Sequence, residues 1–228
     1  MVTQYPAIYR DEFGEETVTI ENDGKTLSLV LRGREFKGKN FHSLGILDDL
    51  KEYNSFNICL GDLCGYSIDS NIPVWLISEN REEQTQLHVH VEYGKCDAQN
   101  KTTCEVLQLT LVYQGQVYQS DGRNFEGTFD EQLTDLDDAL PKEVYLKTCW
   151  NCIFSDYFIS GSGMFGEMAC FRNTKDEYLK VKSKMDLSGL WDRRAENVQE
   201  IHLCPEFRKR PLGVGGRYVG HGNMQKRG

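Results

Sequence analysis

Alternating apolar and polar positions along the first 120 residues predict β-strands. Residues 16–21 and 26–32 alternate on either side of Asp23-Gly24, a dipeptide typical of a tight turn, and so predict a hairpin. Further runs of the same kind predict strands at 56–60, 73–78, 86–93, 106–113 and 117–120. Many short strands joined by turns are typical of an antiparallel β-sandwich or barrel-like domain.

Helical spacing first appears near residue 130. Leu133, Leu136 and Leu140 recur at intervals of three and four, which predicts a helix over 130–140 that ends at Pro141. A strand over 142–147 and a second helix over 175–184 are predicted in the same way.

These elements predict an α+β protein, mostly antiparallel β. We expect an acidic β domain over residues 1–140, a small zinc-stabilised α/β module over 141–207, and a basic, glycine-rich, mobile tail over 208–228.

Charge separates the two parts of the chain. Residues 1–140 hold 11 Lys and Arg against 25 Asp and Glu, a net charge of −14, whereas residues 141–228 hold 15 against 10, a net charge of +5. An acidic first part argues against a broad nucleic-acid surface there, because phosphate binding depends on Lys and Arg. Acidic domains suit a basic protein partner, although such charge also serves solubility.

The chain has no apolar stretch long enough to span a bilayer. Its first 16 residues carry acidic groups where a signal peptide has a basic start and an apolar core. We therefore expect a cytoplasmic protein without a membrane partner.

Four of the eight cysteines have spacing that predicts a structural Zn²⁺ site. Cys149 and Cys152 form a Cys-x-x-Cys pair at the end of a predicted strand, and Cys170 and Cys204 supply two further sulfurs. His202 is an alternative ligand, because it shares a strand face with Cys204. The second half lacks another Cys-x-x-Cys pair, so the pattern departs from the commonest zinc ribbon.

Thiol redox chemistry is the competing interpretation of the Cys-x-x-Cys pair. It requires a helix directly after the first cysteine, whereas the last seven residues of 153–166 hold three glycines and two serines, which is a loop composition. The remaining cysteines, Cys59, Cys64, Cys96 and Cys104, are expected in the core or in loops. They would form a second metal site only if their two segments met.

Two other motifs invite a functional interpretation. His88, His90 and Glu92 share one face of a predicted strand, yet Glu92 is too near in sequence to bind the same ion as both histidines, so we expect a solvated outer face. The glycine-rich segment 161–166 lacks the Lys-Ser or Lys-Thr of a phosphate-binding loop and is expected to be a connector. No catalytic residue set is apparent.

The C-terminal part resembles an uncharacterised bacterial family of unknown function. The similarity rests on the motif CxNCxxSDY from Cys149, on CFRN from Cys170, and on LCPEF from Leu203. The resemblance implies that these cysteines belong to a family motif. It implies no activity.

We therefore expect a non-enzymatic protein-binding module, of which an immunity or antitoxin-like protein is one form. The alternatives are a zinc-dependent hydrolytic enzyme and a nucleic-acid-associated module. The second would use the basic residues Arg208, Lys209, Arg210, Arg217, Lys226 and Arg227. Neither the oligomeric state nor the partner follows from the sequence.

Overall fold

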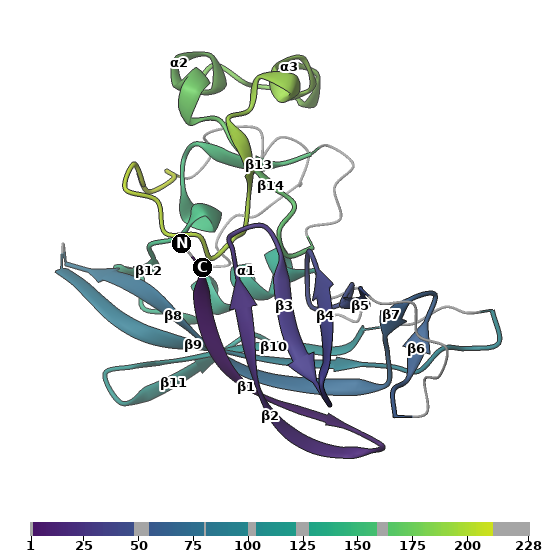
Figure 1. Ribbon diagram of the computed structural model, residues 1–228. Coiled ribbons are helices and arrows are strands. Elements are labelled where there is room, and N and C mark those ends of the chain that lie inside the picture. Colours follow the sequence, from purple (N-terminus) through teal and green to yellow (C-terminus); the bar gives the residue numbers. More distant parts are fainter. Residues whose placement is uncertain are drawn as a thin grey trace.

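One long antiparallel sheet runs through the first two thirds of the chain (Figure 1). The structure is a computed structural model, and it describes residues 2–47, 55–79, 81–99, 104–121, 128–158 and 164–211. The strands before the first helix are β1 (Thr3–Asp11), β2 (Gly14–Asn22), β3 (Leu27–Leu31), β4 (Arg34–Gly38), β5 (Gly45–Ile46), β6 (Ile58–Cys59), β7 (Asp62–Leu63), β8 (Tyr66–Ser78), β9 (Arg81–Tyr93), β10 (Cys104–Tyr113) and β11 (Gln116–Gln119).

The predicted hairpin at Asp23-Gly24 is confirmed, with Asn22 of β2 opposite Leu27 of β3. The α+β class with mostly antiparallel strands is also confirmed. The described strands nevertheless form neither a two-sheet sandwich nor a closed barrel. Twelve of them make one open sheet in the order β11-β10-β9-β8-β1-β2-β3-β4-β5-β7-β6, with β12 (Val144–Leu146) beside β8.

The difference arises at β1 and at the two longest strands. β1 pairs with β2 on one side and with β8 on the other, so it joins two hairpin groups into one sheet. The β8 and β9 strands have 13 residues each, longer than their predicted ranges of 73–78 and 86–93. Alternation reveals which face of a strand is buried, but it does not reveal which strand becomes the neighbour.

Helix α1 (Phe129–Ala139) covers part of the inner face, against β10 and β11. The Thr128 side chain caps the helix by accepting a hydrogen bond from the Glu131 N–H. Leu133, Leu136 and Leu140 are buried, as the helical spacing predicts, and Phe129 at the start of the helix is buried as well. No helix among the described residues is long and apolar enough to cross a membrane.

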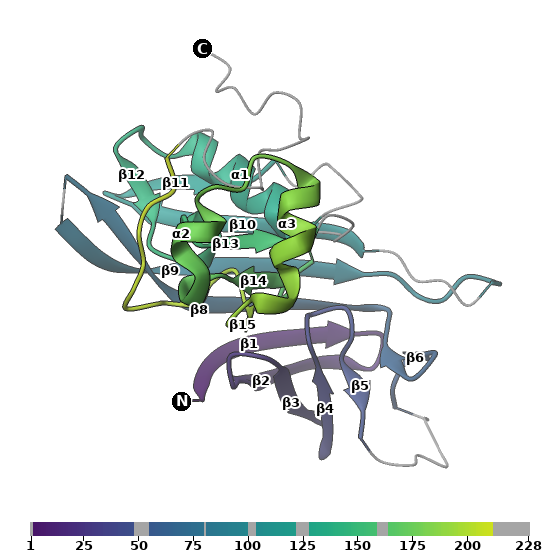
Figure 2. The same cartoon turned by 90° about the horizontal axis from the view of Figure 1, so that it is seen from above.

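The C-terminal module lies over the same sheet (Figures 1 and 2). It contains the 3-10 turn η1 (Cys149–Asn151), the three-stranded sheet β13 (Ser155–Tyr157), β14 (Met168–Cys170) and β15 (Glu196–Val198), the turn η2 (Arg172–Thr174), the helices α2 (Lys175–Tyr178) and α3 (Lys184–Leu190), and the turn η3 (Trp191–Arg193). One continuous apolar core includes residues of the large sheet, of α1 and of this module. A second, smaller apolar cluster lies beneath α2 and α3.

The predicted helix over 175–184 is only partly correct, because α2 ends at Tyr178 and α3 begins at Lys184. Local hydrogen bonds explain the break. The Ser183 side chain accepts from the Asp186 N–H, and the Asp186 carboxylate accepts from the Lys182 N–H. Such short-range bonds compete with a continuous helix and favour a new start.

The first residues of the predicted tail belong to the packed module. The Ile153 N–H donates to the Arg208 carbonyl, the Arg210 N–H donates to the Asn151 carbonyl, and the Arg210 side chain is buried. Its guanidinium donates to the Cys152 carbonyl at 3.0 Å, to the Ser155 carbonyl and to the Tyr178 hydroxyl. The packed module therefore extends to Arg210, whereas residues 212–228 lie outside the described part of the chain.

Replacing Arg210 with alanine should destabilise the protein by about 3 kcal/mol, because it leaves buried carbonyls and the Tyr178 hydroxyl without their donor. The exposed Arg208 gives the matched control, and Arg208→Ala should change the free energy of unfolding by less than about 0.5 kcal/mol. Urea unfolding followed by circular dichroism measures both. Equal stability of the two variants would contradict this account of Arg210.

Candidate metal centre

The four predicted zinc ligands gather where the two apolar clusters meet. Cys149, Cys170 and Cys204 belong to the main core, and Cys152 belongs to the smaller cluster of the module. All four side chains are between 2% and 6% exposed, and none is in a disulfide. The structure therefore brings together thiols that are separated by up to 55 residues in the sequence.

Backbone hydrogen bonds bring these segments together. The Cys149 N–H donates to the His202 carbonyl at 2.9 Å, which fixes η1 beside the segment that carries Cys204. The pairing of β13 with β14 places Ser155 opposite Cys170. A turn follows Cys204, whose carbonyl accepts from the Phe207 N–H at 3.1 Å.

The other three thiols contribute to the electrostatic surroundings of Cys149. Burial raises the pKa of Cys149 far above its usual value, and the charges of Cys152, Cys170 and Cys204 raise it further. Burial also raises the pKa of Cys170, although the Arg172 backbone N–H donates to its sulfur and partly offsets the shift. Without a metal, the thiols of Cys149 and Cys170 therefore favour the neutral form.

The described side chains contain no group of three or more His, Cys, Asp or Glu residues that could hold a metal ion as they stand. His202, the alternative ligand, is half-buried, and burial lowers its pKa. Its backbone carbonyl contributes the bond to Cys149.

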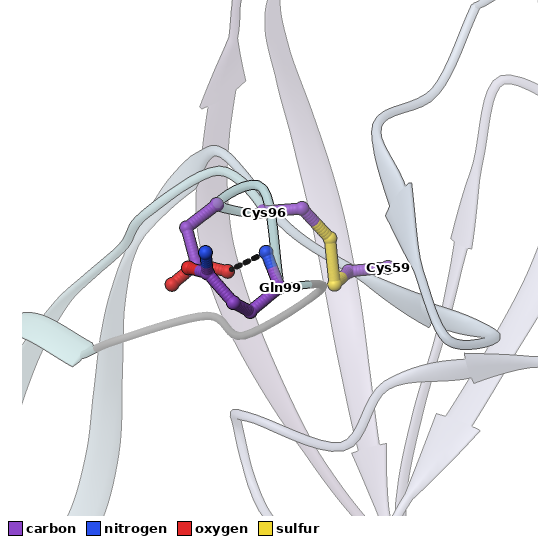
Figure 3. Close-up of a disulfide and its surroundings, with 4 residues drawn as sticks. Cys59, Cys96 and Gln99 are labelled. Carbon is purple, nitrogen blue, oxygen red and sulfur yellow. Dashed lines mark hydrogen bonds between the residues drawn. A yellow bond between two sulfur atoms is a disulfide. The ribbon is translucent and has the colours of Figure 1, made fainter.

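The other cysteine segments meet at a distant end of the large sheet. Cys59 and Cys96 form a disulfide between β6 and the segment after β9 (Figure 3), which corrects the expectation of unlinked core or loop cysteines. The Cys64 thiol is buried beside them and accepts from the Cys96 backbone N–H. Spacing alone could not reveal this link, because the two cysteines are 37 residues apart. The Cys104 side chain lies outside the described part of the structure.

His88 and His90 lie on the outer face of β9, as predicted, and both contact Asp69 of β8. One Asp69 oxygen lies 2.7 Å from the His90 Nδ1 atom and 3.3 Å from the His88 Nε2 atom. The other ring nitrogen of His90 contacts Glu92 at 3.1 Å, and Arg10 forms an ion pair with Asp69. Both nitrogens of His90 are therefore engaged, which leaves no free lone pair for a metal.

A buried polar junction that the sequence did not predict lies between the module and the large sheet. Glu200 is completely buried, and its carboxyl group accepts from the Tyr157 hydroxyl at 3.0 Å and from the Gly166 N–H at 2.6 Å. Gly166 of the glycine-rich segment thus contributes a backbone donor to Glu200. Residues 161–163 of that segment lie outside the described residues. Burial raises the Glu200 pKa to about 8. No periodic pattern around Glu200 distinguishes it from a surface carboxylate.

This raised pKa predicts a pH dependence of stability. Between about pH 4.5 and pH 8, Glu200 is ionised in the unfolded chain but protonated in the folded protein, so rising pH should lower the free energy of unfolding, by at most about 1.4 kcal/mol per pH unit. Above pH 8 the effect should level off. Urea unfolding of the protein and of Glu200→Gln from pH 5 to pH 8 isolates this contribution, and a constant difference between the two proteins would contradict it.

Comparison with known proteins identifies a family but no activity. Neither the search of curated proteins nor the search of solved structures found a significant match. A family described as a family of unknown function (DUF6304) matches residues 3–155, which include the large sheet, α1, Cys149 and Cys152. The match ends before Cys170 and Cys204, so it covers only the start of the C-terminal signature. Because it spans more than half of the chain, this protein belongs to the DUF6304 family of unknown function.

Proposed function

We propose that this protein is a non-enzymatic binding protein whose C-terminal module is stabilised by a structural zinc ion. The supporting observation is the convergence of four buried, unlinked cysteines at the boundary between the two apolar clusters. The ligands would be Cys149, Cys152, Cys170 and Cys204. Free cysteine is often buried without any metal, so metal content is the decisive measurement.

The surroundings of the cysteines suit a zinc–thiolate centre. Zinc binds deprotonated thiols, and four thiolates with one Zn²⁺ carry a net charge of −2. Arg172 and Lys175 are within electrostatic reach of Cys170 and Cys204 and would offset this charge. The Arg172 backbone N–H already donates to the Cys170 sulfur. Binding requires the sulfurs to turn towards a common centre, because the present arrangement holds no ready group of three ligands.

A binding role fits this chemistry better than catalysis. Four cysteines close the coordination shell of zinc, whereas catalytic zinc keeps a position open for water or substrate. The outer histidine pair is engaged with Asp69 and Glu92. A nucleic-acid role through the basic cluster is weakened because the Arg210 side chain is buried among module carbonyls.

The purified protein should contain about one zinc per chain, measured by elemental mass spectrometry. Cys170→Ser should remove it, because loss of one thiolate opens the shell, and the apparent stabilisation at stake is on the order of 10 kcal/mol. Hydrogen exchange should then increase in β13, β14 and β15, while β8 and β9 stay protected. Cys64→Ser serves as the control, because Cys64 lies beside the disulfide at the other site, and it should keep the zinc. A metal-free protein with the same protection pattern would refute the zinc proposal.

The acidic end of the β8–β9 hairpin suits a basic protein partner. This end extends beyond the pairing of β1, which meets β8 only through residues 66–70. Glu79, Glu82 and Glu83 are exposed there, and Glu82 forms an ion pair with Lys147. The high negative charge of the first 140 residues favours fast association with a positively charged protein, as in an immunity or antitoxin-like role.

Affinity purification from native lysate with the full, zinc-loaded chain should recover one stoichiometric basic protein. The double variant Glu79→Gln, Glu83→Gln should slow association with that partner by about threefold or more, since removing charge at an interface rim mainly lowers the on-rate. Glu35→Gln, on the exposed face of β4, is the control for loss of an acidic charge elsewhere on the sheet and should bind normally. Repeated failure to recover a stoichiometric partner would count against a protein-binding role, and an unchanged on-rate would exclude the hairpin end.

A further inference from the structure

A cleft of about 490 Å³ lies where β15 faces the turn between β2 and β3. Its walls come from Gly24 and Lys25 of that turn, from Lys39 after β4, from Gly166, and from residues 192 and 194–199. Figures 1 and 2 show the turn between β2 and β3 beside the C-terminal module. The volume is within the range of small-molecule sites.

A buried hydrogen-bond donor without a partner lines this cleft. Gln199 is 2% exposed, and its Nε2 atom has no hydrogen-bond partner among the described residues. Its orientation follows from a chain of hydrogen bonds. The Gly24 N–H donates to Asn22 Oδ1, which turns the Asn22 Nδ2 group towards Gln199 Oε1 at 2.7 Å. The amino group of Gln199 is therefore the unpaired one, and a buried donor of this kind needs an acceptor.

Positive charge surrounds that donor. Lys25 and Lys39 line the cleft, and neither Nζ atom has an ion-pair partner among the described residues. Arg194 is held in place by bonds to Asn197 Oδ1 and to the Trp191 carbonyl, which use two of its five N–H groups.

The acidic residues of the cleft do not cancel this charge. Glu196 forms an ion pair with Arg172 at 2.5 Å. Asp192 is exposed at the rim. Two lysines, an arginine and Gln199, whose unpaired amino group is buried at the edge of the cleft, therefore line the same space, and together they are the complement of an anionic acceptor group.

We propose that this cleft binds a small organic molecule through its phosphate or carboxylate group. The Gln199 amino group would donate to one oxygen, and Lys25, Lys39 and Arg194 would balance the negative charge. The site goes beyond the proposed function and needs neither zinc nor a protein partner. Its lining residues come from both the family-matched region, residues 3–155, and the C-terminal module beyond it.

Nuclear magnetic resonance of the ¹⁵N-labelled full chain tests this site directly, because the side-chain amide of Gln199 gives its own signals. Inorganic phosphate and acetate would be titrated separately to about 50 mM at constant ionic strength, a range that detects millimolar affinity. Saturable shifts of the Gln199 side-chain amide and of the Lys25 and Lys39 backbone amides are expected. Saturation by phosphate alone assigns the phosphate group, and saturation by acetate alone assigns the carboxylate.

Surface variants separate site binding from general charge effects. Lys25→Gln and Lys39→Gln should each weaken binding about three- to fivefold, as expected for partly exposed ion pairs, without threatening the fold. Lys142→Gln removes an exposed lysine that does not line the cleft, and it should leave the affinity within twofold. Absence of saturable shifts with both anions would overturn the proposal, as would equal affinity in all three variants.

Discussion

The structure depends on covering the inner face of one long sheet. Buried side chains alternate along β8 from Tyr66 to Leu76 and along β9 from Leu87 to Val91, and the apolar surface that they form must be removed from water. Helix α1 covers part of it, and the C-terminal module contributes Trp150, Phe165 and Met168 to the same core. The module therefore covers part of the apolar face of the sheet. The boundary at residue 140 is a change of amino-acid composition, and the residues on its two sides share one apolar core.

Buried polar groups are concentrated where the C-terminal module contacts the large sheet. The Glu200 carboxyl group and the pair of Asn22 with Gln199 lie near that boundary, and the four cysteines lie where the main core meets the smaller apolar cluster of the module. Buried polar groups stabilise a contact only when each has its partner, and they specify one arrangement of the two surfaces. Gln199 keeps one donor without a partner among the described residues, and the four cysteines are buried without a disulfide among them. These two features underlie the proposed ligands, an anion near Gln199 and a zinc ion at the cysteines.

A disulfide stabilises the end of the sheet that is formed by β5, β6 and β7. There the strands are short, with two residues each in β5, β6 and β7, and little helical covering is present among the described residues. The Cys59–Cys96 disulfide joins β6 to the segment that follows β9, so it links an edge of the sheet to one of its longest strands. A cross-link of this span restricts the unfolded chain and compensates for a small local core.

The sequence by itself determined the local elements and the class of the protein. Alternation identified the β2–β3 hairpin and parts of β6, β8, β9, β10, β11 and β12, and helical spacing identified α1, because these patterns record which side of an element faces the core. Strand β1, strand β4 and the short strands β5, β7, β13, β14 and β15 were not predicted. The cysteine spacing singled out Cys149, Cys152, Cys170 and Cys204, but it did not predict how their sulfur atoms are placed relative to one another. Only the tertiary structure decided that β1 joins two hairpin groups into one sheet, that Arg210 is buried, and that Glu200 and Gln199 meet partners from distant segments. Such contacts join residues that lie from 32 to 177 positions apart in the sequence, and a local periodic pattern carries no record of which surfaces pack together.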